Sequence, residues 1–171
     1  MALEQFLPVQ VFAFLLVFSR LAGTLMLLPG LGEAYVPPRM RLLFALLLAL
    51  IVAPLVSAFL PPEPGSIFVL FKLILAEVVI GIYIGIVSRI LLLTLDSVGR
   101  FIALTIGMSN AEVFNPSIST QASLPGLLLT TMGVLILFST NMHHVLILGI
   151  SESYTMFPVG VFLPTGDMAF V

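Results

Sequence analysis

The sequence predicts an all-α integral membrane protein with about four long hydrophobic helices, forming a single membrane-embedded domain over residues 1–171. Composition is the first reason: the chain is 60% hydrophobic and 8% charged, and its mean hydropathy of +1.26 exceeds that of ordinary soluble domains. The second is length, because several apolar stretches with few charges are long enough to cross a bilayer. The third is the position of helix-breaking residues, because turns rich in proline and glycine separate these stretches.

Charge and cysteine content exclude several classes of function. The net charge is −2 and no cluster of lysine and arginine is present, so the chain is not expected to bind nucleic acid. Without cysteine it forms neither disulfides nor thiolate metal sites. Residues 1–28 lack a basic start and carry Glu4, so they are interpreted as a retained helix and not as a signal peptide.

Residues 6–28 and 42–60 form the first two predicted helices. The first has one ionisable side chain, Arg20, and its 23 residues are long enough to span a bilayer. The second has 19 uncharged residues. Insertion of its large apolar side chains contributes about −5 kcal/mol. This outweighs the cost of about 3 kcal/mol expected for a kink at Pro54.

A third helix is predicted over residues 67–95, and its 29 residues exceed an upright span. It therefore either tilts or continues as a long helix through Ile106. One line along this helix carries small or polar side chains, including a Gly-x-x-x-Gly step that lets another helix approach closely. This line is either a packing face within the chain or a contact with a different subunit. Its residues are Glu77, Gly81, Gly85, Ser88 and Gly99.

The fourth predicted helix covers residues 124–150, with Ser123 as its N-cap and a proline in its first turn. His143 and His144 are adjacent and point about 100° apart, so they are poorly placed to share a metal. A zinc site would need a third close ligand. We therefore expect a hydrogen-bonded histidine pair at the membrane interface, with no metal and no other cofactor.

Arg20, Glu77 and Arg89 are ionisable side chains at hydrophobic positions. Each costs about 3 kcal/mol at the centre of a bilayer if it is unpaired, so each is expected to face a partner or a wet cavity. Arg20 and Glu77 form the most natural pair. Alternatively, the apolar block is not immersed at its full depth and these charges meet protein or headgroups. Asp96 and Arg100 have the i,i+4 spacing of an ion pair.

Catalytic motifs are missing from the sequence, and the chain is not expected to be an enzyme. The Gly-x-Ser-x-Gly turn that would support a serine hydrolase is absent. Only Glu77 is clearly placed for a proton relay. A free-standing small-solute transporter is an alternative function, although the paired repeats that such a protein would need are not found.

The longest polar interruption runs over residues 96–125. Irregular backbone beside helices of membrane length is tolerated at the water interface, inside protein, or along a wet cavity. We favour a loop inside a channel assembly, with a solvent-facing loop between two helices as the alternative.

Three segments carry a family resemblance. They are FSRLAGTLMLLPGLGEAYVPPRMRL at residues 18–42, GRFIALTIGMSNAEVFNPSISTQ at 99–121 and LFSTNMHHVLILGISESYTMFPVG at 137–160. In this order they resemble the FliR/SctT family, a component of the type III secretion export gate. The asparagine–histidine–histidine region and the Asn-Pro-Ser turn favour the flagellar branch over the virulence branch.

The resemblance implies a place in a larger assembly. One copy of this subunit would join FliP- and FliQ-type subunits, with an FlhB-type component, in a helical export gate of the bacterial inner membrane and flagellar basal body. Unfolded substrate proteins would pass through its centre. Two departures stand out: Met142 occupies a position where the family commonly has glycine, and the chain stops at Val171, which suggests a truncated polypeptide.

The resemblance also implies that residues 106–122 help to plug the pore. Glycine, asparagine and serine favour an irregular loop there. Methionine and phenylalanine would supply soft apolar contacts around a passing chain. The residues expected to form this plug are Gly107, Met108, Ser109, Asn110, Phe114, Asn115, Pro116 and Ser117.

Overall fold

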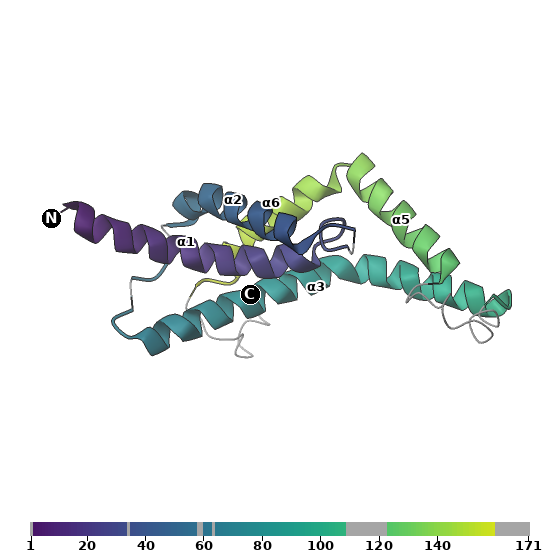
Figure 1. Cartoon of the computed structure of the whole chain (residues 1–171), viewed down its shortest axis with the longest axis horizontal. Helices are drawn as coiled ribbons and strands as arrows, with labels where there is room; N and C mark the ends of the chain where they lie inside the picture. The colour runs from purple at the N-terminus through teal and green to yellow at the C-terminus, as the bar shows by residue number, and fades with distance from the viewer. Residues whose placement is uncertain (1, 34, 58–59, 63, 109–122, 160–171) are drawn as a thin grey trace. The chain divides into compact units, whose positions relative to one another are not determined.

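The computed structural model describes residues 2–33, 35–57, 60–62, 64–108 and 123–159, with side chains from residue 10 onward. Throughout these ranges the regular secondary structure is α-helix, which confirms the predicted all-α class (Figure 1). The helices are α1 (Ala2–Leu27), α2 (Pro38–Val56), α3 (Ile67–Thr105), α5 (Leu124–Ser139) and α6 (Met142–Met156).

Three of these helices are long and apolar enough to cross a membrane. The qualifying stretches are Gln10–Leu27 within α1, all of α2 and all of α3. Helices α5 and α6 pass the same test only as a pair with a break between them, which raises the number of spans to four. The 39 residues of α3 continue well past the upright length of a span, so the long-helix alternative is the one observed.

The fourth predicted helix is not continuous, and the prediction of one helix over residues 124–150 was wrong on this point. Helix α5 ends at Ser139, and the Thr140 amide donates to the Ile136 carbonyl at 2.9 Å. Asn141 then adopts a left-handed backbone conformation with φ of 58°. Asparagine tolerates this conformation better than most residues, so the break occurs where the sequence permits it.

The chain divides into two compact units. One contains Met1–Val87 and Ile147–Val171, and the other contains Ser88–Leu146. The predicted single domain over residues 1–171 stays a prediction. In the first unit, the hydrophobic core combines side chains from α1, α2, α6 and the residues just after α6. Its buried members are Phe12, Leu16, Val17, Leu21, Ala49, Ala53, Val56, Ile150, Tyr154 and Val159.

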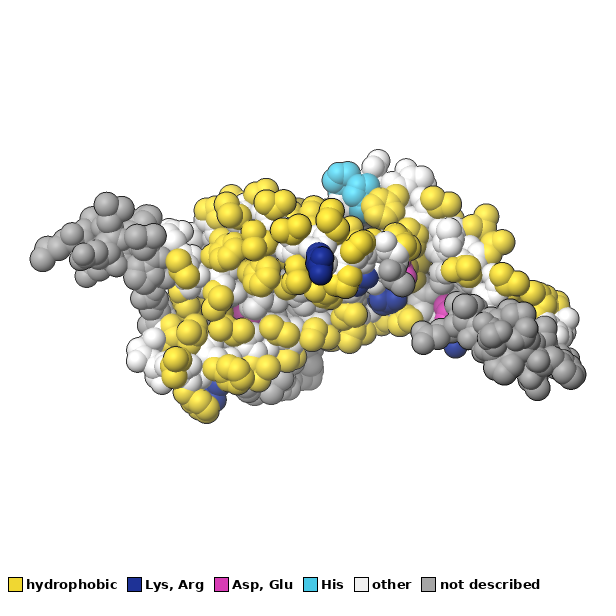
Figure 2. Space-filling view, viewed as in Figure 1, with side chains coloured by type: hydrophobic (Ala, Val, Ile, Leu, Met, Phe, Trp, Pro, Cys, Tyr) yellow, Lys and Arg dark blue, Asp and Glu magenta, His cyan; other side chains and the backbone are white. Residues whose placement is uncertain are grey.

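Helix α2 packs through a stripe of small side chains. Ala45, Ala49 and Ala53 recur every fourth residue, and all three are buried. Small side chains let two helix backbones come close, which compensates for the weak hydrophobic drive between helices in lipid. Most of the large side chains of α2 lie on its other faces and are exposed, as Leu47, at 59%, illustrates. Figure 2 shows hydrophobic side chains over most of the visible surface of α2.

The connection between α1 and α2 is held by side-chain hydrogen bonds to its backbone. Tyr35 donates its hydroxyl to the Gly30 carbonyl at 2.9 Å, and Gly30 has a φ of 84° that favours glycine. Arg41 donates to the carbonyls of Val36 and Glu33. Burial, together with the Glu33 carboxylate, raises the pKa of Tyr35 above its ordinary value.

In the second unit, α5 begins against the later part of α3. Ser123 caps α5 as predicted, with its hydroxyl accepting from the Gly126 amide at 3.2 Å. Gly99 lies so close to the backbone of Gly126 that a side chain would collide with it. The predicted ion pair between Asp96 and Arg100 is also present, at 2.8 Å.

Candidate functional site

The most elaborate polar cluster lies inside the first unit and is centred on Arg20. The structure brings together the pair that the sequence favoured: Arg20 Nε lies 2.6 Å from Glu77 Oε2, and Nη2 lies 3.0 Å from Oε1. Both residues are fully buried. The contact is bidentate, with two N–H groups of the planar guanidinium donating to the two carboxylate oxygens, and this is the strongest geometry for an arginine–carboxylate pair.

The cluster also includes the end of α6 and the residue after it. Arg20 Nη1 donates to Ser153 Oγ at 3.1 Å, and Nη2 donates to the Phe157 carbonyl at 2.9 Å. The aromatic ring of Tyr154 lies against the guanidinium, with 4.0 Å between Arg20 Cζ and the ring centroid. We call Arg20, Glu77, Ser153, Tyr154 and Phe157 the Arg20 cluster.

This arrangement answers the question of how a charge is tolerated in an apolar helix. Arg20 makes four hydrogen bonds, and its countercharge is in direct contact. A buried charge that is paired and hydrogen-bonded avoids most of the cost of leaving water. Arg20 and Glu77 therefore meet protein of their own chain, whatever the depth of the surrounding helices in a bilayer.

Glycines allow α1 and α3 to approach closely beside the Arg20 cluster. A side chain at Gly81 would collide with the backbone carbonyl of Arg20, and one at Gly85 would lie 2.8 Å from Leu27 Cβ. From the other helix, a side chain at Gly23 would lie 3.0 Å from the Val78 carbonyl oxygen. Gly81 and Gly85 therefore pack within the chain, and contact of the predicted line with a different subunit stays a prediction.

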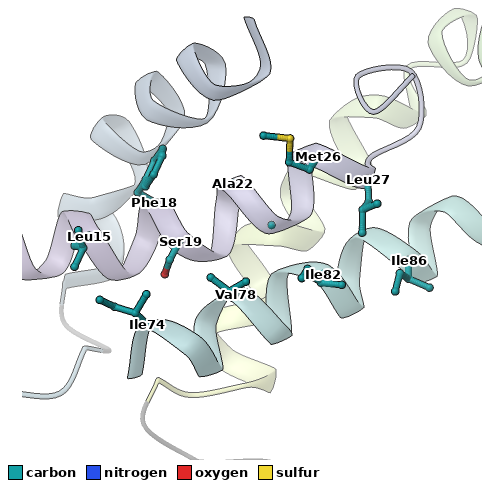
Figure 3. A pocket seen from close by; sticks show the side chains of 11 residues that line it. Leu15, Phe18, Ser19, Ala22, Met26, Leu27, Ile74, Val78, Ile82 and Ile86 are labelled. Atoms are coloured by element: carbon teal, nitrogen blue, oxygen red, sulfur yellow. The ribbon is translucent and has the colours of Figure 1, made fainter. Parts of the chain in front are cut away.

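A groove of about 810 Å³ runs along the crossing of α1 and α3 (Figure 3). Leu15, Ser19 and Leu27 are directed from α1 toward α3 in this view. Ser19 is the polar side chain of the lining, and its hydroxyl donates to the Leu16 carbonyl at 2.7 Å. The groove therefore suits an apolar occupant. Its lining is Leu15, Phe18, Ser19, Ala22, Gly23, Met26, Leu27, Ile74, Val78, Ile82 and Ile86.

The other predicted site residues are spread over the chain. Ser88 and Arg89 are half-buried on α3, and Gly99 contacts α5 within the second unit. Gly107 has a φ of 76° just after α3, and Met108 is exposed. The remaining predicted plug residues lie outside the described part of the chain: Ser109, Asn110, Phe114, Asn115, Pro116 and Ser117.

The histidine pair does not have the predicted hydrogen bonding. His143 Nδ1 is buried and has no hydrogen-bond partner in the structure. The imidazole instead contacts rings, with centroids 4.1 Å from His144 and 5.0 Å from Phe138. The break after Ser139 explains the difference, because it brings Phe138 beside the first turn of α6. Within the described residues no group of three or more candidate ligands could hold a metal.

Sequence reasoning missed the residues of α6 that complete the Arg20 cluster. Ser153 and Phe157 are four residues apart, so they lie on the same side of the chain as it leaves α6. A serine and a tyrosine next to each other in a hydrophobic helix are a signal that could have marked a buried polar contact. Gly23 was also missed, although it lies three residues after Arg20 and therefore on a neighbouring part of the helix surface.

Three apolar helices of membrane-spanning length, with a charged pair enclosed among their side chains, define a multi-pass helical membrane protein. The chain belongs to the family described as bacterial export proteins, family 1, whose model matches residues 11–171.

Relatives support this membership. The flagellar biosynthetic protein FliR of Caulobacter vibrioides is 37% identical over 160 residues, which cover 94% of this chain and 64% of the relative. The FliR protein of Bacillus subtilis is 31% identical, with coverage of 92% and 61%. Yop proteins translocation protein T of Yersinia pestis is 35% identical, with coverage of 68% and 44%. The chain thus spans less than two thirds of the length of these relatives.

Proposed function

We propose that this chain is a flagellar-type subunit of the type III protein-export gate. Together with FliP- and FliQ-type subunits and an FlhB-type component, it forms the conduit through which unfolded substrate proteins leave the cell. Its location is then the bacterial inner membrane at the flagellar basal body. The observation that carries the proposal is the family match over residues 11–171, together with flagellar relatives that cover more than nine tenths of the chain.

The exposed apolar surface is consistent with a subunit that needs neighbours. Over an apolar stretch of 18 residues in each helix, the chain itself buries 22% of the residues in α2 and 11% of those in α3. The rest of these helices, including side chains such as Leu55 and Phe68, must be covered by lipid or by other subunits. Apolar helix faces that the chain does not cover itself are expected in a subunit of a multi-subunit membrane assembly.

The test is complementation in a strain that lacks its own FliR protein. The full-length protein should restore motility and secretion of flagellar substrates. Gly81→Leu should abolish both, because the substitution separates α1 from α3, whereas Gly149→Ala should not, because a methyl group there meets no atom within 4 Å. Failure of the unsubstituted protein to restore secretion, despite normal insertion into membranes, would contradict the proposal.

The plugging role of residues 106–122 forms part of this proposal. It rests on the irregular, polar composition of the segment and on its position after the long helix α3. Deletion of residues 109–119 should make the assembly leak small ions, measured as conductance across planar bilayers. The same conductance with and without the deletion would rule out plugging and favour a solvent-facing loop.

A virulence-type export subunit is a second candidate, because Yop proteins translocation protein T matches 68% of the chain. Complementation distinguishes the two: a flagellar subunit restores motility in a strain without FliR, and a virulence subunit restores secretion in a strain without protein T. A free-standing small-solute transporter would be active after purification as a single polypeptide in liposomes. We further propose that the subunit is not an enzyme and serves a purely structural role in the gate.

A further inference from the structure

The end of α6 needs hydrogen-bond donors from outside the helix. Helix termini leave their last carbonyl groups without intrahelical partners. Here Pro158 follows closely, and it lacks the amide that would otherwise serve the Tyr154 carbonyl. The Phe157 amide still donates to the Ser153 carbonyl at 2.8 Å, so the helical pattern runs to the last residue before the proline.

We propose that Arg20 is a positioning residue that caps the C-terminal end of α6 and fixes the direction in which the chain leaves the helix. Two of its contacts go to this end: Nη1 to Ser153 Oγ at 3.1 Å and Nη2 to the Phe157 carbonyl at 2.9 Å. A cation at this position also opposes the partial negative charge of a helix C-terminus. The cap is unusual because α1 supplies it, more than 130 residues earlier in the chain.

Glu77 orients the cap. Its carboxylate accepts from Nε at 2.6 Å and from Nη2 at 3.0 Å. Because the guanidinium is planar and rigid, these two contacts fix the direction of the other N–H groups, which then point at α6. Tyr154 covers the face of the guanidinium from the same helix. Helix α1 therefore supplies the guanidinium that donates to the end of α6, and α3 supplies the carboxylate that orients it.

The residues just beyond the cap indicate what it positions. Val159 lies two residues after Phe157 and is buried, with 8% of its surface exposed, in the core that α1 and α2 share. The chain therefore stays packed against the core of the first unit as it leaves α6. This inference concerns the fold and does not depend on the proposed export function.

Backbone hydrogen exchange followed by mass spectrometry on the purified complex tests the cap. Arg20→Lys retains the charge but cannot make the same four contacts, so exchange over residues 153–157 should accelerate about tenfold or more. Ser153→Ala retains the ion pair and removes one contact of Arg20, together with the hydrogen bond from the serine hydroxyl to the Ile150 carbonyl, and it should give a smaller acceleration at the same residues. Exchange over residues 45–56 of α2 should not change in either variant.

Thr24→Ala is the matched control. Thr24 is fully buried within α1, where its hydroxyl donates to the Arg20 carbonyl at 3.0 Å; among the described residues it has no hydrogen bond to α6. Residues 153–157 should exchange at the normal rate in this variant. If Arg20→Lys prevents assembly, Ser153→Ala decides the question. Unchanged exchange over residues 153–157 in Ser153→Ala, or an equal acceleration over residues 45–56, would overturn the proposal.

Discussion

Substitution of Gly81 by alanine perturbs the closest approach of two helices by a single methyl group. An ideal Cβ at this position would overlap the Arg20 carbonyl oxygen and lie 3.1 Å from the carbonyl carbon and 3.2 Å from Cα. These are backbone atoms, so no side-chain rotation relieves the contact. Overpacking of this kind costs about 1–3 kcal/mol, and a rigid backbone places Gly81→Ala near the upper value.

The same substitution also has a favourable component. Alanine is better than glycine within a helix by about 1 kcal/mol. The net effect expected for Gly81→Ala is therefore a loss of about 2 kcal/mol in the free energy of unfolding. Gly149→Ala is the matched control, because no atom lies within 4 Å of its added methyl group, and it should be neutral or stabilising by up to about 1 kcal/mol.

Unfolding of the purified protein in detergent by increasing mole fractions of dodecyl sulfate, followed by circular dichroism of the helices, measures both variants. Gly81→Ala should unfold at lower dodecyl sulfate than the unsubstituted protein, and Gly149→Ala at the same or higher. If Gly81→Ala were as stable as Gly149→Ala, the close contact between α1 and α3 would be refuted.

The remaining predictions use the same unfolding assay. Arg20→Met and Glu77→Gln should each lower the free energy of unfolding by about 3–5 kcal/mol, because each leaves a buried group without its partner. The double variant should lose less than the sum of the two single losses, and strictly additive losses would contradict the pairing. Tyr154→Phe should change stability by less than about 0.5 kcal/mol, because the buried hydroxyl has no hydrogen-bond partner in the structure; a large loss would reveal a contact. Ser123→Ala should lower the free energy of unfolding by about 1 kcal/mol through loss of the α5 cap. An unchanged midpoint of unfolding in dodecyl sulfate would show that the cap is dispensable.

Much of the fold could be predicted from local sequence. Runs of apolar residues bounded by proline and glycine defined α1, α2 and α3 because helix formation and membrane compatibility depend on a short stretch of chain. The Ser123 cap and the contact between Asp96 and Arg100 were predictable for the same reason, since each involves residues only three or four positions apart.

Other features depend on contacts that no local pattern specifies. Asn141 breaks the fourth helix, yet asparagine occurs within helices as well, and only its backbone conformation in the folded chain reveals the break. The contacts of Arg20 with Ser153 and Phe157 join residues 133 and 137 positions apart. Charge alone could suggest Glu77 as a partner for Arg20, but a serine hydroxyl and a backbone carbonyl carry no comparable signal.

The mass of the native complex tests the central claim most directly. The protein should be extracted from membranes under mild conditions and analysed by native mass spectrometry without a crosslinker. We predict one copy of this subunit in an assembly with FliP- and FliQ-type polypeptides that also bury the apolar faces of α2 and α3. A single polypeptide carrying only lipid and detergent, or an oligomer made solely of this chain, would contradict the account.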